Sequence, residues 1–212
     1  MLTMQSTRFA VAVLAAALSL LAASEQSAPA QADWINALRQ GGYVIVFRHG
    51  ASRQDQADTD PLNPSNVAQQ RQLTDAGRAK AKEIGEAFRK LRIPVGQVQT
   101  SVFNRAVETG SLMNLGQVTS SLDLTDQGIV LTPAENYRRS QALRQLAATV
   151  PPAGTNTILV THKTNILDTF GKELFDVREG EASVFQPDGG GYKLIVRVQA
   201  DEWSKLAQAA PN

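Results

Sequence analysis

The chain has 212 residues, with 21 basic and 20 acidic side chains, two histidines and no cysteine. Hydrophobic residues make up 42% of the sequence, which excludes a disordered chain and is enough for one substantial domain. The formal net charge of +1 argues against a general nucleic-acid or membrane-surface binder. Without cysteine there are no disulfides, cysteine-based zinc sites, iron–sulfur clusters or thiol catalysis. Any imidazole chemistry must therefore involve His49 and His162.

Residues 1–32 have the pattern of a secretory signal peptide. Arg8 precedes an apolar run over residues 9–23, and small and polar residues follow this run. The run is short for a permanent anchor, because a membrane-spanning helix needs about 20 apolar residues. We therefore predict cleavage after Ala32 and a periplasmic or secreted protein that is not inserted in the membrane. An uncleaved N-terminal anchor is the alternative.

The mature chain begins with a predicted helix over residues 33–40, which the Gly41-Gly42 pair ends. Residues 43–47 form a continuous β-branched and aromatic run, which is typical of a strand buried on both faces. Residues 51–72 are polar and predict a long loop, and loops of that length are usually functional or mobile. We interpret three acidic residues of this loop as solvated charges, namely Asp55, Asp58 and Asp60.

Three helices and a strand are predicted in the middle of the chain. Thr74 is suited to cap a helix that runs to about residue 92. Residues 95–101 form a weaker strand candidate, and Asn104 is expected to cap a helix that ends near residue 115. After a further loop, Thr132 and Pro133 provide a cap and a first-turn proline for a helix over residues 133–149.

The C-terminal part repeats the strand–helix pattern and then changes to a hairpin. Residues 157–161 predict a second buried strand, followed by a helix over residues 163–171. Residues 182–186 and 192–199 flank a Pro-Asp-Gly-Gly-Gly segment, which is typical of a β-hairpin. Strands that alternate with helices predict a three-layer α/β/α sandwich with a mostly parallel central sheet. We expect residues 33–212 to form a single domain.

His49 lies two residues beyond the run at residues 43–47, and His162 lies two residues beyond the apolar run at residues 158–160. The carboxyl ends of strands form the ligand crevice in open α/β sheets. His49 and His162 are therefore expected at one edge of the sheet. Arg48 precedes the first histidine, and Arg105 lies near the start of a helix beyond another candidate strand. Free backbone N–H groups and a guanidinium at a helix start suit an anion. Two arginines and two imidazoles at one point would hold a phosphoryl group.

Four short motifs, in order along the chain, resemble those of the histidine phosphatase superfamily, which includes phosphoglycerate mutases and acid phosphatases. Residues 48–52 (RHGAS) match its R-H-G-x-S signature, and residues 73–77 (LTDAG) match its L-T-x-x-G helix start. Residues 101–109 (SVFNRAVET) resemble its S-x-x-x-R-A-x-x-T segment, and residues 160–162 (VTH) match its V-x-H unit. The resemblance extends over most of the mature chain and implies a phosphoglycerate mutase-like fold.

The resemblance also implies a reaction. His49 would attack phosphorus and form a phosphohistidine, which water then hydrolyses, without a metal or other cofactor. Arg48, Arg105 and His162 would bind the phosphoryl oxygens, and Ser52 is a further candidate contact. The neutral form of an imidazole is available near pH 7, since the ordinary pKa of histidine is about 6.5. The expected substrate is a small phosphomonoester, for example an envelope sugar phosphate.

The proton for the leaving group has a less specific sequence signal. Glu135, at the start of the helix predicted from Pro133, is the candidate general acid, because relatives of the mutase branch carry a glutamate after the second arginine. The alternative interpretation is structural: Thr132 and Glu135 fit a helix capping box. Lys163 stands where some acid phosphatases carry an aspartate. Two alternative functions remain, a non-catalytic module that binds a phosphorylated ligand and a mutase-like phosphotransferase.

Overall fold

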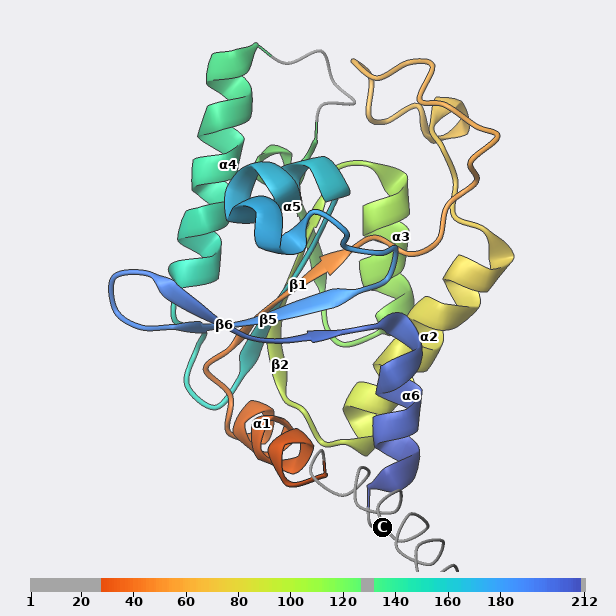
Figure 1. Cartoon of the computed structure of the whole chain (residues 1–212). Helices are drawn as coiled ribbons and strands as arrows, with labels where there is room; N and C mark the ends of the chain where they lie inside the picture. Colours follow the sequence, from red (N-terminus) through yellow and green to blue (C-terminus); the bar gives the residue numbers. More distant parts are fainter. Residues whose placement is uncertain (1–27, 127–131, 211–212) are drawn as a thin grey trace, which may run out of the picture. The chain divides into compact units, whose positions relative to one another are not determined.

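The computed structural model describes residues 28–126 and 132–210, with side chains described from residue 33 onward (Figure 1). The predicted signal peptide lies outside these residues except for positions 28–32. Within the described residues, positions 35–126 and 132–210 belong to one compact unit. Among the described residues, no helix has the length and apolar character that crossing a membrane requires.

A six-stranded sheet with the order β3-β2-β4-β1-β5-β6 forms the centre of the unit. Its strands are β1 (Val44–Arg48), β2 (Val95–Ser101), β3 (Val118–Ser121), β4 (Asn156–Thr161), β5 (Ala182–Pro187) and β6 (Tyr192–Val198). The first four strands in the sheet order run parallel, whereas β5 pairs antiparallel with both β1 and β6. The mostly parallel sheet and the terminal hairpin are thus confirmed.

Helices cover both faces of this sheet. They are α1 (Ala28–Gln40), α2 (Asp75–Lys90), α3 (Asn104–Met113), α4 (Pro133–Ala148), α5 (Lys163–Phe170) and α6 (Ala200–Ala209). Three short 3₁₀ turns complete the described elements: η1 (Val67–Gln69), η2 (Leu122–Leu124) and η3 (Gly171–Leu174). Helices α4 and α5 pack on one face, and α2, α3 and α6 pack on the other (Figure 1). The predicted three-layer α/β/α sandwich is confirmed.

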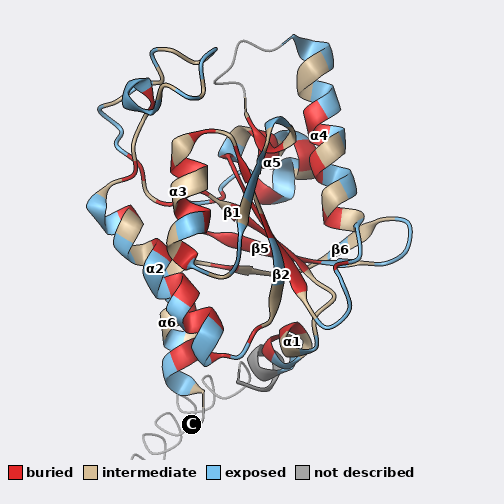
Figure 2. Ribbon diagram, turned by 180° about the vertical axis from the view of Figure 1, so that it is seen from behind, coloured by how far each residue is buried: buried red, intermediate tan, exposed pale blue. Residues whose placement is uncertain are grey.

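The central strands β1 and β4 are the most buried part of the molecule (Figure 2). Four consecutive residues of β1 are at most 1% exposed, and the three consecutive apolar residues of β4 are fully buried: Val44, Ile45, Val46, Phe47, Ile158, Leu159 and Val160. Because helices cover both faces, these strands carry apolar residues at consecutive positions rather than alternating ones. The two strands that precede the histidines are therefore rigid supports for the residues at their carboxyl ends.

Several elements differ from the sequence-based expectations. Helix α1 begins at Ala28 instead of residue 33, and Asn104 is the first residue of α3 while Phe103 occupies its N-cap. The Asn104 side chain instead donates to Gln72 Oε1 at 3.2 Å. The sequence patterns do not predict strand β3, which is a short, polar edge strand. They do not predict helix α6 either. The start of α6 has Gln199 in place of a typical cap residue, with its N–H bound by a Glu202 carboxylate oxygen at 2.6 Å.

Candidate active site

The carboxyl ends of β1 and β4 bring the two histidines together. Arg48 is in register with Thr161 across the two strands, and the backbone N–H of His49 donates to the Thr161 carbonyl at 3.0 Å. The residues that follow each strand are therefore neighbours. The ring centroids of His49 and His162 are 5.1 Å apart. The two residues are 113 positions apart in the sequence, as are Tyr43 and Asn156, which form a hydrogen bond. The structure thus places both imidazoles at one edge of the sheet.

His49 is a buried, neutral imidazole with a defined tautomer. Its side chain is almost completely enclosed, and Nδ1 lies 2.8 Å from the carbonyl oxygen of Gly50. A carbonyl oxygen only accepts, so Nδ1 carries the ring proton and Nε2 keeps its lone pair. Burial holds the pKa of His49 well below its usual value, and nearby His162 and the positive charge of Arg105 act in the same direction. Near neutral pH the ring is therefore an uncharged nucleophile.

His162 is equally buried but presents the opposite ring nitrogen. Its Nε2 lies 2.7 Å from the Ser101 hydroxyl oxygen, while Nδ1 makes no hydrogen bond and lies 3.8 Å from an Asp126 carboxylate oxygen. Burial lowers the pKa of His162 well below its usual value, and nearby arginines, Arg105 first, lower it further. When Ser101 is the donor to Nε2 of the neutral ring, the ring proton is on Nδ1, and Nδ1–H is then a donor. His162 can therefore bind an anion without carrying a charge.

Arg105 is a buried guanidinium at the start of α3. Its Cζ lies 4.6 Å from the centroid of the Phe103 ring, and Nη1 contacts both carboxylate oxygens of Asp58, at 3.0 and 3.2 Å. Nη2 is 3.9 Å from an Asp126 oxygen, whereas Nε makes no hydrogen bond. Burial lowers the pKa of Arg105, and the two carboxylates oppose this change. An arginine remains charged near neutral pH even when burial lowers its pKa.

Arg48 has a similar arrangement at the end of β1. Its Nη1 donates to the Val177 carbonyl at 2.9 Å, Nη2 lies 3.4 Å from Glu179, and Nε makes no hydrogen bond. Burial lowers the pKa of Arg48, while the Glu179 carboxylate raises it. The Ser52 hydroxyl donates to the same Glu179 at 2.7 Å. Ser52 is therefore attached to the carboxylate that orients Arg48, and it contacts the site through that carboxylate.

Three buried side-chain nitrogens of these residues have no hydrogen-bond partner in the described part of the chain: Arg48 Nε, Arg105 Nε and His162 Nδ1. Buried polar groups are nearly always paired, and leaving one unpaired costs about 1–3 kcal/mol. On both arginines protein acceptors hold Nη1 and leave Nε unpaired. Because none of the three has an acceptor among the described residues, an external anion with several oxygens fits them.

The backbone that carries these groups is fixed by residues of the matched motifs. The Gly50 N–H donates to the Thr109 hydroxyl at 3.0 Å, and that hydroxyl donates to the Arg105 carbonyl at 2.6 Å. At Gly77, in the first turn of α2, a Cβ atom would collide with the Ala51 carbonyl. The turn after β1 therefore packs directly on the start of α2, with no space for a side chain at Gly77, and is bound to α3 through Thr109.

Several carboxylates and one hydroxyl of the site were missed in the sequence. The interpretation of Asp58 as a solvated charge is wrong, because its carboxylate is bound to the buried Arg105, 47 positions away in the chain. Glu179, Ser101 and Asp126 likewise contact the site through residues distant in sequence. No local pattern predicts such pairs. Ser101 alone had a signal, as the first residue of a matched motif.

Glu135 lies in the first turn of α4, as predicted, but its contacts argue against a role as general acid. Its N–H donates to the Thr132 hydroxyl at 3.2 Å, and its carboxylate binds Arg138 and Arg139, each at 2.9 Å. These arginines lower the pKa of Glu135 to about 2. Its carboxylate is therefore engaged by two guanidinium groups of its own helix. The structure thus has the Thr132 half of the predicted capping box, while the Glu135 carboxylate binds these two arginines instead.

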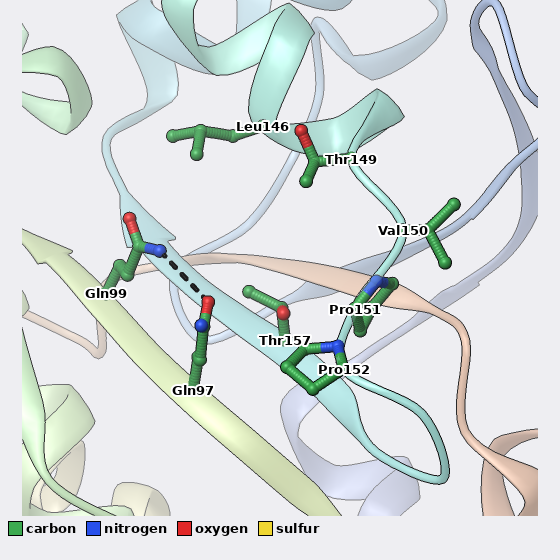
Figure 3. A pocket seen from close by; sticks show the side chains of 8 residues that line it. All are labelled: Gln97, Gln99, Leu146, Thr149, Val150, Pro151, Pro152 and Thr157. Carbon is green, nitrogen blue, oxygen red and sulfur yellow. Dashed lines mark hydrogen bonds between the residues drawn. The ribbon is translucent and has the colours of Figure 1, made fainter.

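A pocket of about 300 Å³ lies near the amino end of β4, far along the strand from His162 (Figure 3). It is lined by Gln97, Gln99, Leu146, Thr149, Val150, Pro151, Pro152 and Thr157. The two glutamine side chains bond to each other at 3.4 Å. No ionisable side chain lines this pocket, so it lacks groups for acid–base or nucleophilic chemistry.

Comparisons with known proteins agree with this geometry at the level of fold. No protein-family model matches the sequence, and no curated protein sequence matches it either. The protein histidine phosphatase SixA, in a complex with tungstate, is 18% identical with a TM-score of 0.53, over 76% of this chain and 98% of SixA. A mutant phosphoserine phosphatase from Entamoeba histolytica, in complex with phosphoserine, is 14% identical with a TM-score of 0.51, over 74% of this chain and 97% of that one.

A third solved structure, YhfR from Bacillus stearothermophilus, is 16% identical with a TM-score of 0.51, over 73% of this chain and 95% of its own. At these identities the likeness concerns the fold. All three proteins are members of the histidine phosphatase superfamily. The chain therefore has the phosphoglycerate mutase-like fold of the histidine phosphatases, with the four motif residues Arg48, His49, Arg105 and His162 at the carboxyl edge of its sheet.

Proposed function

We propose that the chain is a phosphomonoester hydrolase that acts through a phosphohistidine on His49. The observation that supports this proposal is the set of three unpaired N–H donors around a neutral imidazole whose Nε2 keeps its lone pair. A phosphoryl group offers three oxygens to such donors. The structural neighbours, which include a protein histidine phosphatase and a phosphoserine phosphatase, agree with this class of reaction.

The first half of the reaction transfers the phosphoryl group to the enzyme. The donors of Arg48, Arg105 and His162 bind the phosphoryl oxygens and stabilise the charge that they carry in the transition state. His49 Nε2 attacks phosphorus in line with the ester bond, so the P–N bond forms as the P–O bond breaks. The electron pair of the broken bond stays on the leaving oxygen, which takes up a proton.

The second half returns the enzyme to its starting state. Water attacks phosphorus, the P–N bond breaks and its electron pair returns to Nε2, while the water loses a proton. Asp126 lies 3.8 Å from His162 Nδ1 and 3.9 Å from Arg105 Nη2, which places a carboxyl group beside the phosphoryl position. We therefore assign both proton transfers to Asp126. Asp58 and Glu179 instead hold the two arginines.

The decisive experiment is a comparison of the mature protein with its His49→Ala variant. We expect the wild type to hydrolyse simple phosphomonoesters in excess chelator and to accumulate acid-labile phosphate on His49 in a rapid quench. The variant should lose activity by about a thousandfold or more. It should still bind tungstate in calorimetry, because the three donors are retained. Activity that survives in the variant would contradict the proposal.

A panel of substrates separates this function from the alternatives. Nucleotides, sugar phosphates, phytate and phosphopeptides should be tested together, since the donors described above bind only the phosphoryl group. Tight tungstate binding with no turnover on any of them would identify a phosphate-binding module instead. Transfer of phosphate to an acceptor alcohol in preference to water would identify a mutase-like phosphotransferase.

We also propose that residues 1–32 direct export. The support is their sequence: a basic residue, then an apolar run, then small residues before Asp33. Expression of the full chain with a C-terminal tag, followed by fractionation and N-terminal sequencing, tests this proposal. We expect a periplasmic or secreted product that begins at Asp33. A full-length product in the cytoplasm would contradict it.

A further inference from the structure

Arg71, in the long segment between β1 and α2, lies beside the site but has no part in the mechanism above. Its neighbours fix its backbone against the start of α3. The Asn104 N–H donates to Gln70 Oε1 at 2.7 Å, and the Asn104 side chain donates to Gln72 Oε1 at 3.2 Å. The Arg53 N–H donates to the Gln72 carbonyl at 2.9 Å. Arg71 is therefore held on both sides.

A single carboxylate oxygen joins Arg71 to the site. The Arg71 N–H donates to Asp58 Oδ1 at 2.9 Å, and the same oxygen accepts from Arg105 Nη1 at 3.0 Å. The backbone of Arg71 and the guanidinium of Arg105 thus meet on one atom. This contact places the base of the Arg71 side chain a few ångströms from a phosphoryl-binding arginine.

The Arg71 guanidinium has no counter-ion in the described part of the chain. Arg48 faces Glu179, and Arg105 faces Asp58. Arg71 is half-buried, and its side chain makes no hydrogen bond or ion pair with any described residue. Three guanidinium groups near one point repel each other unless anions balance them. The uncompensated charge is that of Arg71.

The charge of Arg71 also acts on the groups that would bind the phosphoryl oxygens. It contributes to the lowered pKa values of Arg48, Arg105 and His162. Together with the shared Asp58 oxygen, this places Arg71 beside those groups. Any further anionic group of a phosphomonoester belongs to its leaving group, which is the part of the substrate that extends beyond the phosphoryl group.

We propose that Arg71 determines substrate specificity by binding a second anionic group, a carboxylate or a phosphate, on the leaving-group side of the substrate. The transferred phosphoryl group already has the donors of Arg48, Arg105 and His162. A guanidinium beyond them gives bidentate hydrogen bonds to a further carboxylate or phosphate. This inference rests on the proposed phosphatase function, since it assigns a leaving-group side to the site.

The test uses two substrates of nearly equal size. Phosphoglycolate carries a carboxylate where 2-hydroxyethyl phosphate carries a hydroxymethyl group. We expect Arg71→Gln to lower kcat/KM for phosphoglycolate by about tenfold or more, as the loss of a charge-assisted hydrogen bond requires, and for 2-hydroxyethyl phosphate by less than about threefold. Arg71→Lys should retain part of the preference. A third substrate, ethylene glycol bisphosphate, shows whether phosphate replaces carboxylate.

Arg53→Gln is the matched control, because Arg53 lies in the same segment, is exposed and is paired with Asp55 at 2.9 Å. It should leave the ratio of the two substrates unchanged. An equal loss on both substrates in Arg71→Gln would overturn the proposal, because Arg71 would then bind the transferred phosphoryl group or support the fold. No loss on either substrate would overturn it too.

Binding measurements keep this inference distinct from the proposed function. In the His49→Ala background, calorimetry with phosphoglycolate and 2-hydroxyethyl phosphate needs no turnover. We expect Arg71→Gln to weaken phosphoglycolate binding by about tenfold while tungstate affinity changes little. If the wild type binds both compounds but hydrolyses neither, the phosphatase proposal fails while the binding result still decides the role of Arg71. If His49→Ala and the double variant His49→Ala, Arg71→Gln bind phosphoglycolate with equal affinity, that role is rejected.

Discussion

His162 binds an anion as a neutral donor only if a neighbour fixes its tautomer. The Ser101 hydroxyl, 2.7 Å from Nε2, is placed to do so, and its oxygen in turn accepts from the Phe103 N–H at 3.2 Å. A buried charged imidazole beside Arg105 would be costly, which agrees with the lowered pKa of His162. Ser101 is thus a positioning residue for a donor that carries no charge.

Replacement of Ser101 by alanine should release this tautomer. We expect Ser101→Ala to lower kcat/KM by about tenfold, because Nδ1 no longer carries the proton in all molecules. Nitrogen-15 NMR of the two histidines should show a mixture of tautomers at His162. Ser120→Ala is the control, since the Ser120 hydroxyl has Thr100, at 3.3 Å, as its only hydrogen-bond partner among the described residues. A single unchanged tautomer with reduced activity would assign Ser101 another role.

Substitutions of two carboxylates, Asp126 and Glu135, are expected to have different effects on protonation of the leaving group. Asp126→Asn should slow alkyl phosphates by about 100-fold or more and affect nitrophenyl phosphate little, since a good leaving group needs no acid. Glu135→Gln should leave the ratio of the two substrates unchanged, because Glu135 is held as an anion by Arg138 and Arg139. A leaving-group effect in Glu135→Gln alone would return the acid role to Glu135.

At the scale of elements, the site depends on how closely the turn after β1 approaches α2. Gly77 allows the first turn of α2 to contact the Ala51 backbone, and the Thr74 N–H donates to the Ala51 carbonyl at 2.9 Å. The sequence motif at residues 73–77 therefore has a packing function as well as a capping one. Thr74 accepts the Gly77 N–H at 3.0 Å, as its predicted role as helix cap requires.

Gly77→Ala tests this packing. A methyl group at this position must displace the Ala51 backbone, so we expect a loss of about 1–3 kcal/mol in the free energy of unfolding. Because the displaced turn carries His49, kcat should fall as well. Urea unfolding and steady-state kinetics measure the two effects. Gly190→Ala is the control, since no atom lies within 4 Å of the position that its methyl group would take, and it should change neither quantity.

At the scale of the whole molecule, the two buried histidines link stability to pH. Both have pKa values well below the usual value in the folded state. Below about pH 6.5 the unfolded chain therefore binds more protons than the folded one. As the pH is lowered, the free energy of unfolding decreases by up to about 1.4 kcal/mol per pH unit for each histidine. The loss starts near the unfolded pKa and ends at the lowered folded pKa.

Urea unfolding at pH 7.5, 6.5 and 5.5 measures this dependence. We expect the wild type to lose stability between the last two values, a range above that in which most carboxylates titrate. The double variant His49→Gln, His162→Gln should show a much smaller change over the same range. Equal slopes for the two proteins would show that the histidines are protonated in the folded state.

Local patterns in the sequence determined the buried strands β1 and β4, the helix starts at Thr74 and Thr132, and the four motif residues of the site. These features depend on residues a few positions apart, where side-chain pattern and backbone geometry are directly coupled. The tertiary structure decided which groups surround the histidines. Asp58 on Arg105 and Ser101 on His162 are pairs from distant segments, and only the packed sheet brings them into contact. Burial likewise set both imidazoles neutral, because desolvation is a property of the whole fold.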